Sequence, residues 1–174
     1  MKERDRWRLG SREADFYRQA LREAAEKTPK VKVVHPEEMP WEDSPQGRIK
    51  HMINERMDRV QTVLDLYMQE VPPGGKSGKH RHMAEECLFV LEGRGYDLHW
   101  DAEFELRERY RWKAAPEAKR FEWEAGDLIL VPVNTLHQHF NADADKPARL
   151  ISVMNCLYRR LGFNDLEQVE EAGG

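Results

Sequence analysis

The sequence has few cysteines, no long apolar run and no excess of basic residues. Cys87 and Cys156 are too few for a disulfide framework, and each lies in an apolar run where a buried thiol is expected. No stretch approaches the roughly 20 apolar residues that span a bilayer, and the N-terminal residues lack the apolar centre of a signal peptide. With 28 Lys and Arg against 32 Asp and Glu, a basic nucleic-acid-binding face is disfavoured. We therefore expect a cytoplasmic protein that binds neither membranes nor nucleic acids.

The 174 residues favour a single domain in three parts. We expect residues 1–58 to form an N-terminal helix and a proline-containing, loop-rich arm, residues 59–160 a barrel, and residues 161–174 a short C-terminal helix or tail. The first helix is predicted from apolar residues on one helical face, namely Tyr17, Ala20, Leu21, Ala24 and Ala25. Alone it would be marginal in water, so we expect it to pack on the barrel or on a second subunit. The terminal helix is predicted around Leu166 and Val169.

From Val60 onward, short apolar or alternating runs are separated by turn residues. The runs are 60–71, 86–91, 96–100, 120–124, 127–133, 135–140 and 148–158. Short strands punctuated by glycine and proline predict an all-β sandwich or barrel. The segment 101–122 is highly charged, with aromatic residues interleaved. It is interpreted either as an extended, solvated hairpin or as a lid or flap that contacts a second subunit.

Four of the seven histidines lie in two H-x-H groups, at residues 80–82 and 137–139. In a strand, residues i and i+2 point to the same face, so such a pair can present two imidazoles side by side. Glu86 follows His82 by four residues and begins an apolar run, where its carboxylate can return to the same face. An isolated H-x-H is more often a surface or core feature than a metal site. Three neutral imidazoles and one carboxylate would suit Fe(II), Mn(II), Co, Ni or Zn, without choosing among them.

The spacing around these residues resembles the two motifs of the cupin superfamily. The first motif, G-x5-H-x-H-x3,4-E-x6-G, is matched by Gly74, His80, His82, Glu86 and Gly93. The second, G-x5-P-x-G-x2-H-x3-N, is matched by Gly126, Pro132, His137 and Asn141. Asn134 stands where the second motif usually has glycine. Asparagine tolerates positive φ better than most residues, so we expect the turn to survive.

The resemblance implies a double-stranded β-helix, that is, a jelly-roll cupin barrel with a metal ion inside its mouth. The implied ligands of one divalent transition metal ion are His80, His82, Glu86 and His137. The stretch from His80 to Tyr96 is most similar to the gentisate-dioxygenase-like cupins, which favours Fe(II), with Mn, Ni, Co or Zn as alternatives. Jelly-roll domains of this kind commonly dimerise, so we expect a homodimer.

Strand parity suggests what else lines the interior. His139 shares parity with His137 and should face inward, either as a core histidine or as a catalytic residue that contacts substrate. We do not expect it to be a ligand, because the other four residues already supply enough. Leu88 and Val90 should form an apolar wall, and Arg81 should point outward. Tyr67 and Gln69 share one face, but the sequence leaves open whether it looks inward. His35, His51 and His99 have no spacing partner, so each is expected to be a surface or core histidine, with a segment folded over the barrel mouth as the alternative for His51.

Three functions are compatible with this pattern. The first is a mononuclear non-haem Fe(II) dioxygenase that acts on a small aromatic or enolisable oxygenated substrate. The second is a metal-dependent isomerase, lyase or decarboxylase, in which the ion is a Lewis acid. The third is a non-enzymatic cupin that binds a small molecule or a metal. One scaffold hosts many chemistries, so the fold alone does not choose among them.

Overall fold

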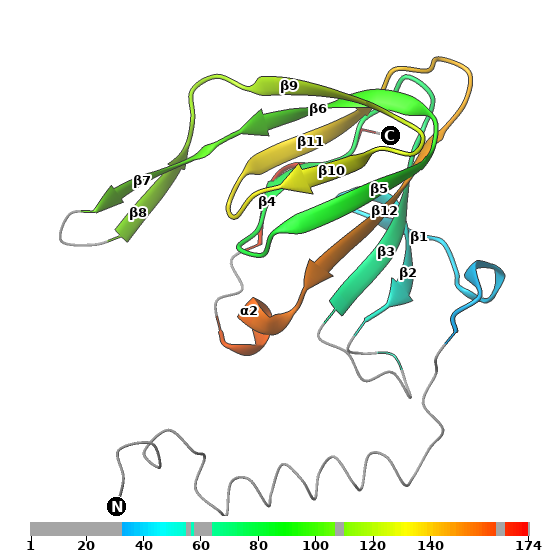
Figure 1. Cartoon of the computed structure of the whole chain (residues 1–174), viewed down its shortest axis with the longest axis horizontal. Coiled ribbons are helices and arrows are strands. Elements are labelled where there is room, and N and C mark those ends of the chain that lie inside the picture. The colour runs from blue at the N-terminus through cyan, green and yellow to red at the C-terminus, as the bar shows by residue number, and fades with distance from the viewer. Residues whose placement is uncertain (1–32, 55–56, 58–63, 107–109, 163–165, 174) are drawn as a thin grey trace, which may run out of the picture.

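The computed structural model describes residues 33–54, 57, 64–106, 110–162 and 166–173. These residues form two antiparallel β-sheets that face each other and a separate two-stranded hairpin (Figure 1). This is the predicted all-β jelly-roll barrel. The predicted N-terminal helix lies outside the described residues. No helix within the described ranges is long and apolar enough to cross a membrane.

The larger sheet has six strands. In sheet order they are β1 (Glu42–Ser44), β2 (Gly47–Ile53), β3 (Leu64–Val71), β12 (Ala148–Asn155), β5 (Glu86–Glu92) and β10 (Leu128–Val131). Every second residue of β5 is buried, because strand side chains alternate between the two faces of a sheet. The inward set is Glu86, Leu88 and Val90, so the apolar wall predicted from Leu88 and Val90 is present.

The smaller sheet has five strands. In sheet order they are β13 (Glu167–Glu170), β4 (Lys79–Arg81), β11 (Leu136–Asn141), β6 (Arg94–Trp100) and β9 (Lys119–Glu124). β11 is the central strand, and His137 on it lies opposite His80 of β4 on one side and His99 of β6 on the other. The register therefore brings three histidines from distant parts of the sequence to one level of the barrel.

The apolar core lies between the two sheets. Its buried cluster consists of Val71, Leu88, Val90, Trp123, Ile129, Val131, Ala148 and Leu150. Fully burying one Leu or Val side chain contributes about 1.5–3 kcal/mol, so this cluster is a main source of the barrel's stability.

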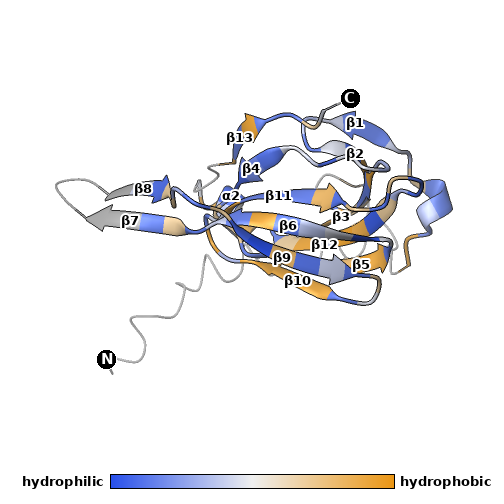
Figure 2. Cartoon of the chain, turned by 90° about the horizontal axis from the view of Figure 1, so that it is seen from above, coloured by the Kyte–Doolittle hydropathy of each residue, from blue (hydrophilic) through white to orange (hydrophobic). Residues whose placement is uncertain are grey.

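Three elements lie outside the sheets. A 3-10 helix, η2 (Pro36–Glu38), precedes β1, and a short helix, α2 (Leu157–Arg160), follows β12. The hairpin of β7 (Ala102–Leu106) and β8 (Tyr110–Ala114) extends away from the barrel (Figure 2). The hairpin expected in 101–122 is therefore present, although residues from Lys119 onward belong to the barrel as β9.

Two predicted boundaries are wrong. β2 lies within the part interpreted as a loop-rich arm, because Ile49 and Met52 are buried and the strand pairs with β3. The sheet therefore begins well before residue 59, and the segment carrying His51 is one of its strands. The predicted C-terminal helix is instead a strand, since Glu167–Glu170 pairs with β4. Pairing with the edge of β4 satisfies the backbone N–H and C=O groups of this segment, whereas so short a helix would be unstable alone.

The cysteine expectation is half right. Cys156 is buried, whereas Cys87 is exposed. Cys87 alternates with the inward residues Glu86 and Leu88, so the period of the strand sends its thiol outward despite the apolar run.

The turn residue Asn134 has φ of 57°, the left-handed conformation for which the motif normally uses glycine. The turn before β11 therefore survives the substitution, as expected.

Candidate metal centre

Four side chains meet at one point inside the barrel. His80 lies on β4, His82 directly follows that strand, Glu86 begins β5, and His137 lies on β11. Their ligand atoms all lie within 4.8 Å of one another. The most exposed of the four, His82, has only 7% of its surface accessible. The structure thus brings together all four side chains that the sequence assigns to a metal.

The three imidazoles make the same kind of contact with the backbone. Each directs Nδ1 at a backbone carbonyl oxygen: His80 at Gly78 (3.3 Å), His82 at Ala84 (2.7 Å) and His137 at Thr135 (2.9 Å). A carbonyl can only accept, so Nδ1 carries the proton and the lone pair of each neutral ring is on Nε2. Metal-binding histidines are typically oriented by such contacts through the other ring nitrogen.

Two of the three Nε2 atoms lie against Glu86. Its Oε2 lies 3.3 Å from Nε2 of His82 and 3.2 Å from Nε2 of His137. Nε2 of His80 and Nε2 of His137 are buried, and neither has a hydrogen-bond partner in the described part of the chain. Buried polar atoms are normally satisfied, so orphaned lone pairs that face a carboxylate fit a divalent cation. This donor set can hold such an ion.

Glu86 is itself held from the opposite side. Its Oε1 accepts hydrogen bonds from the hydroxyl of Tyr67, at 3.0 Å, and from that of Ser152. Tyr67 therefore faces inward, which settles the question of strand parity that the sequence left open. Ser152 was missed, since a serine within a strand carries no spacing signal; its position opposite Leu88 becomes visible only from the pairing of β12 with β5.

The surroundings shift the pKa values of the four side chains in different directions. Burial is the main cause that lowers the pKa of His80 and of His137 below the ordinary value, so both rings are neutral and ready to ligate. Burial also acts to lower the pKa of His82, but the hydrogen bond and charge of Glu86 outweigh it and raise that pKa. Burial raises the pKa of Glu86, yet His137 and His82 together hold it well below its usual range. Glu86 is therefore ionised at neutral pH.

His139 lies next along β11 but belongs to a different group. It is fully buried, and its Nδ1 lies 2.9 Å from Oδ1 of Asp97 on β6. Its Nε2 is buried and has no hydrogen-bond partner within the described ranges. The ring centroids of His137 and His139 are 5.4 Å apart. His139 thus faces the interior, as predicted, and is not one of the four clustered ligands.

Three further residues to which the sequence analysis gave a place are Arg81, His51 and His99. Arg81 points away from the cluster and donates from Nε to Glu167 at 2.8 Å, but it is almost fully buried and its guanidinium lies 3.3 Å from the ring of Trp112. His51 lies on β2 opposite Tyr67, with ring centroids 6.3 Å apart, so it approaches the site from a strand. His99 is buried beside Asp97.

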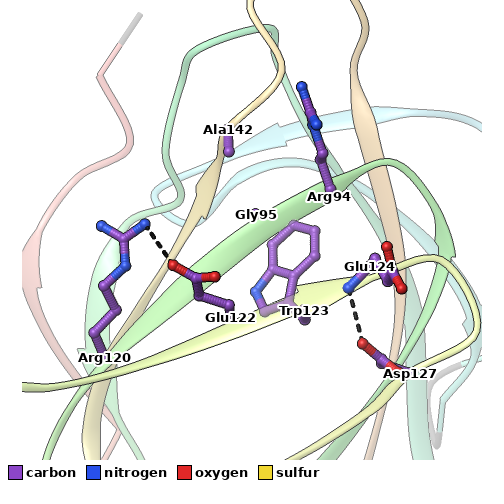
Figure 3. Close-up of a pocket in the computed structure, with 8 residues that line it drawn as sticks. All are labelled: Arg94, Gly95, Arg120, Glu122, Trp123, Glu124, Asp127 and Ala142. Carbon is purple, nitrogen blue, oxygen red and sulfur yellow. Dashed lines mark hydrogen bonds and ion pairs between the residues drawn. The ribbon is translucent and has the colours of Figure 1, made fainter.

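The pocket in Figure 3 lies away from this cluster. It measures about 510 Å³ and lies against β6 and β9, with Arg94, Arg120 and Glu122 among its lining residues. Arg120 pairs with Glu122, and Trp123 lies between the flanking charged side chains (Figure 3). None of the four clustered residues lines it, so the candidate centre is the buried cluster.

The two facing sheets and the buried His-His-Glu-His cluster define a cupin with a candidate metal centre. The sequence pattern of the family described as auxin binding protein matches residues 27–159, which is most of the chain. The chain belongs to this family. No curated protein matches it.

Solved structures show the same fold. An oxalate decarboxylase from Lactobacillus farciminis in complex with formate is 17% identical, with a TM-score of 0.59, over 84% of this chain and 36% of that one. A point variant of oxalate decarboxylase from Bacillus subtilis is 15% identical, with a TM-score of 0.62, over 82% and 33%. Vicilin from hazelnut, Corylus avellana, is 21% identical, with a TM-score of 0.50, over 68% and 31%. The chain spans about a third of the length of these proteins.

Proposed function

We propose that the protein is a metal-dependent cupin enzyme that acts on a small oxygenated substrate. One divalent transition metal ion would be held by His80, His82, Glu86 and His137. The observation that carries this proposal is that all three imidazoles direct Nδ1 at backbone carbonyls, with Nε2 of His82 and of His137 directed at Glu86. Rings held only for packing would have no reason to leave buried lone pairs facing a carboxylate.

The favoured reaction is that of a mononuclear non-haem Fe(II) dioxygenase on a small aromatic or enolisable substrate. The bound ion would supply a site that holds substrate and dioxygen and polarises oxygen atoms. The chain's own residues would hold the ligands in position and exclude water. Tyr67 and Ser152 keep Glu86 in place by hydrogen bonds to Oε1. Leu88 and Val90, both fully buried, exclude water from the neighbouring interior.

His139 is the proposed catalytic residue beside the ligands. Its Nε2 is buried, has no hydrogen-bond partner in the described part of the chain, and would be available to a substrate held beside the ion. Burial lowers the pKa of His139, but the charge and hydrogen bond of Asp97 outweigh it and raise that pKa above its ordinary value. At that atom the ring can accept a proton from an acidic substrate or stabilise a developing negative charge.

A second candidate, a metal-dependent decarboxylase or lyase, is favoured by two observations. The intact Glu86 with a nearby acid–base group suits proton transfer as well as oxygen chemistry. Two of the structural relatives above are oxalate decarboxylases by name. A redox-inactive ion such as Zn would serve this second reaction, whereas dioxygen chemistry with Zn is not expected. A non-enzymatic binding role remains the third alternative.

Elemental analysis of protein purified without chelators or metal-affinity resin tests the site first. We expect about one transition metal ion for each chain, and an empty, metal-replete sample would contradict the proposal. Oxygen uptake with hydroxylated aromatics and β-dicarbonyls then separates the reactions. Iron together with oxygen consumption supports the dioxygenase. Release of CO2 without net oxygen consumption supports the decarboxylase, and no turnover of any compound supports the binding role.

A further inference from the structure

A second buried carboxylate lies inside the barrel, outside the candidate metal cluster. Asp97 is fully buried on β6, directly opposite His139 of β11. Its Oδ1 accepts a hydrogen bond from Nε1–H of Trp123 at 2.8 Å and lies 2.9 Å from Nδ1 of His139. Its Oδ2 lies 3.3 Å from Nε2 of His99. Three ring nitrogens therefore surround this carboxylate. Within the described ranges, no hydrogen bond joins Asp97 to the four clustered side chains.

These contacts fix which nitrogen of His139 carries the proton. An ionised carboxylate only accepts hydrogen bonds, and an indole N–H only donates. Burial acts to raise the pKa of Asp97, but the charge and hydrogen bond of His139 outweigh it and keep that pKa far below its usual range. Nδ1 of His139 must therefore be protonated, and a ring turned over would lose this bond. Nε2 is consequently the nitrogen left for the interior, where it is buried without a partner among the described atoms.

A purely structural role explains this arrangement poorly. Burying a carboxylate is costly unless it is well compensated, and Asp97 is fully buried beside Trp123, a member of the apolar core cluster. In addition, the network ends in an orphaned atom. A network built only for stability would be expected to satisfy every member.

We propose that Asp97 is a positioning residue that fixes the tautomer and orientation of His139, so that Nε2 contacts the substrate held at the metal. Trp123 fixes the carboxylate through its first oxygen, and His99 faces the second oxygen. The inference rests on the proposed function only for the presence of a substrate, because the state of the His139 ring can be measured without one.

The first test observes the ring directly. Full-length protein loaded with Zn(II) and labelled with 15N-histidine reports each imidazole by NMR, and His139 is assigned by the signals lost in His139→Gln. We expect an Nδ1–H tautomer with a slowly exchanging proton. Asp97→Asn should preserve the packing, because its amide oxygen can still accept from Trp123 and His139. In that variant the Nδ1 proton should move upfield and exchange faster. An Nε2–H tautomer in the wild type would overturn the proposal, even if the variant did not fold.

The second test uses a double-mutant cycle with oxalate as a probe of the Zn(II)-loaded protein. Removing an outer-shell partner typically costs 10–100-fold, so we expect Asp97→Asn to weaken oxalate binding by about 10-fold. If Asp97 acts through His139, the same substitution should have no further effect in the His139→Gln background. Equal losses in both backgrounds would contradict the proposal, and unchanged binding in the single variant would do the same. The matched control is Glu122→Gln, a change of an exposed carboxylate on the outer side of the barrel.

Metal content measured on the same samples separates the two proposals. A full complement of Zn(II) together with an unaltered His139 signal in Asp97→Asn would defeat the positioning role alone. An empty site in the wild type would defeat the proposed metal centre, while the His139 tautomer would still be readable. If oxalate does not bind the wild type, the imidazole spectrum decides the positioning role by itself.

Discussion

His137 and His139 lie two residues apart on one strand, are equally buried, and are each paired with a carboxylate, yet their rings are used in opposite ways. His137 gives Nδ1 to the carbonyl of Thr135 and directs Nε2 at Glu86. His139 gives Nδ1 to Asp97 and leaves Nε2 without a partner. In our proposal, the backbone contact of His137 leaves its Nε2 lone pair for a metal ion, whereas the carboxylate contact of His139 leaves its Nε2 for substrate. Which atom holds Nδ1, more than strand parity, thus distinguishes the proposed ligand from its neighbour.

The largest expected effect comes from removing one ring of this pair at a time. His137→Ala should lose most of the metal, because it removes one of four ligands from a buried site. His139→Ala should keep the metal and change substrate binding or turnover, by about 10–100-fold. Metal-to-protein ratios after dialysis against a weak chelator measure this difference. An empty site in His139→Ala beside a filled one in His137→Ala would reverse the assignment of the two rings.

Acidification should affect the three proposed histidine ligands at different pH values. Metal ligation requires neutral rings, so protons compete with the ion as the pH falls. Glu86 raises the pKa of His82, so competition should begin at that ring, above the ordinary histidine value of about 6.5. His80 and His137, whose pKa values burial lowers, should take up protons only at lower pH. We expect the affinity for Zn(II) to fall more than 10-fold between about pH 7 and pH 5.

An equilibrium titration at several pH values measures this effect. His139→Gln should show the same pH dependence as the wild type, since His139 is not a ligand in our assignment. A flat affinity down to about pH 4 would contradict ligation by three imidazoles. A pH dependence that disappears in His139→Gln would instead make that ring part of the centre.

A smaller effect is expected from the hydroxyls behind Glu86. Tyr67→Phe and Ser152→Ala each remove one hydrogen bond to Oε1 and leave the four ligands in place. Such partners of a ligand tune metal affinity, so each variant should bind Zn(II) about 10-fold more weakly. Competition with a chromophoric chelator measures the change. Ser77→Ala is the control: its hydroxyl contacts β11 at the backbone N–H of His139, away from Glu86.

The proposed ligand set could be predicted from the sequence because each member occupies a fixed position in one of two short motifs. Two positions on one strand share a face, and the spacing to Glu86 and His137 is characteristic of the cupin motifs. Asp97 has no such signal. Its parity with His99 is visible in the sequence, but its pairing with His139, 42 residues away, depends on the register of β6 with β11. Ser152 was missed for the same reason, since β12 reaches Glu86 only through a long-range strand pairing.

The wrong boundaries have a related cause. Leu166 and Val169 fit a helical spacing, but that local preference is weak over so few residues. The edge of β4 offered hydrogen bonds that residues Glu167–Glu170 could complete as a strand. Likewise, the prolines before β2 indicated a loop, although the buried side chains of Ile49 and Met52 tie the following segment to the sheet. In both cases, tertiary pairing outweighed local pattern.

The smallest expected effect concerns the turn that leads into β11. Asn134 adopts φ of 57°, and its Oδ1 accepts a hydrogen bond from Nη1 of Arg81 at 3.1 Å. Asn134→Gly relieves the left-handed strain of about 1 kcal/mol but loses a hydrogen bond worth about as much. The two changes should nearly cancel, so the free energy of unfolding should stay within about 1 kcal/mol of the wild type. Asn134→Ala keeps the strain and loses the bond, and should destabilise the protein by about 1–2 kcal/mol. Chemical denaturation of the metal-free variants measures both values. A glycine variant less stable than the alanine variant would contradict this prediction, because the greater conformational entropy of glycine in the unfolded chain would then outweigh the relief of strain.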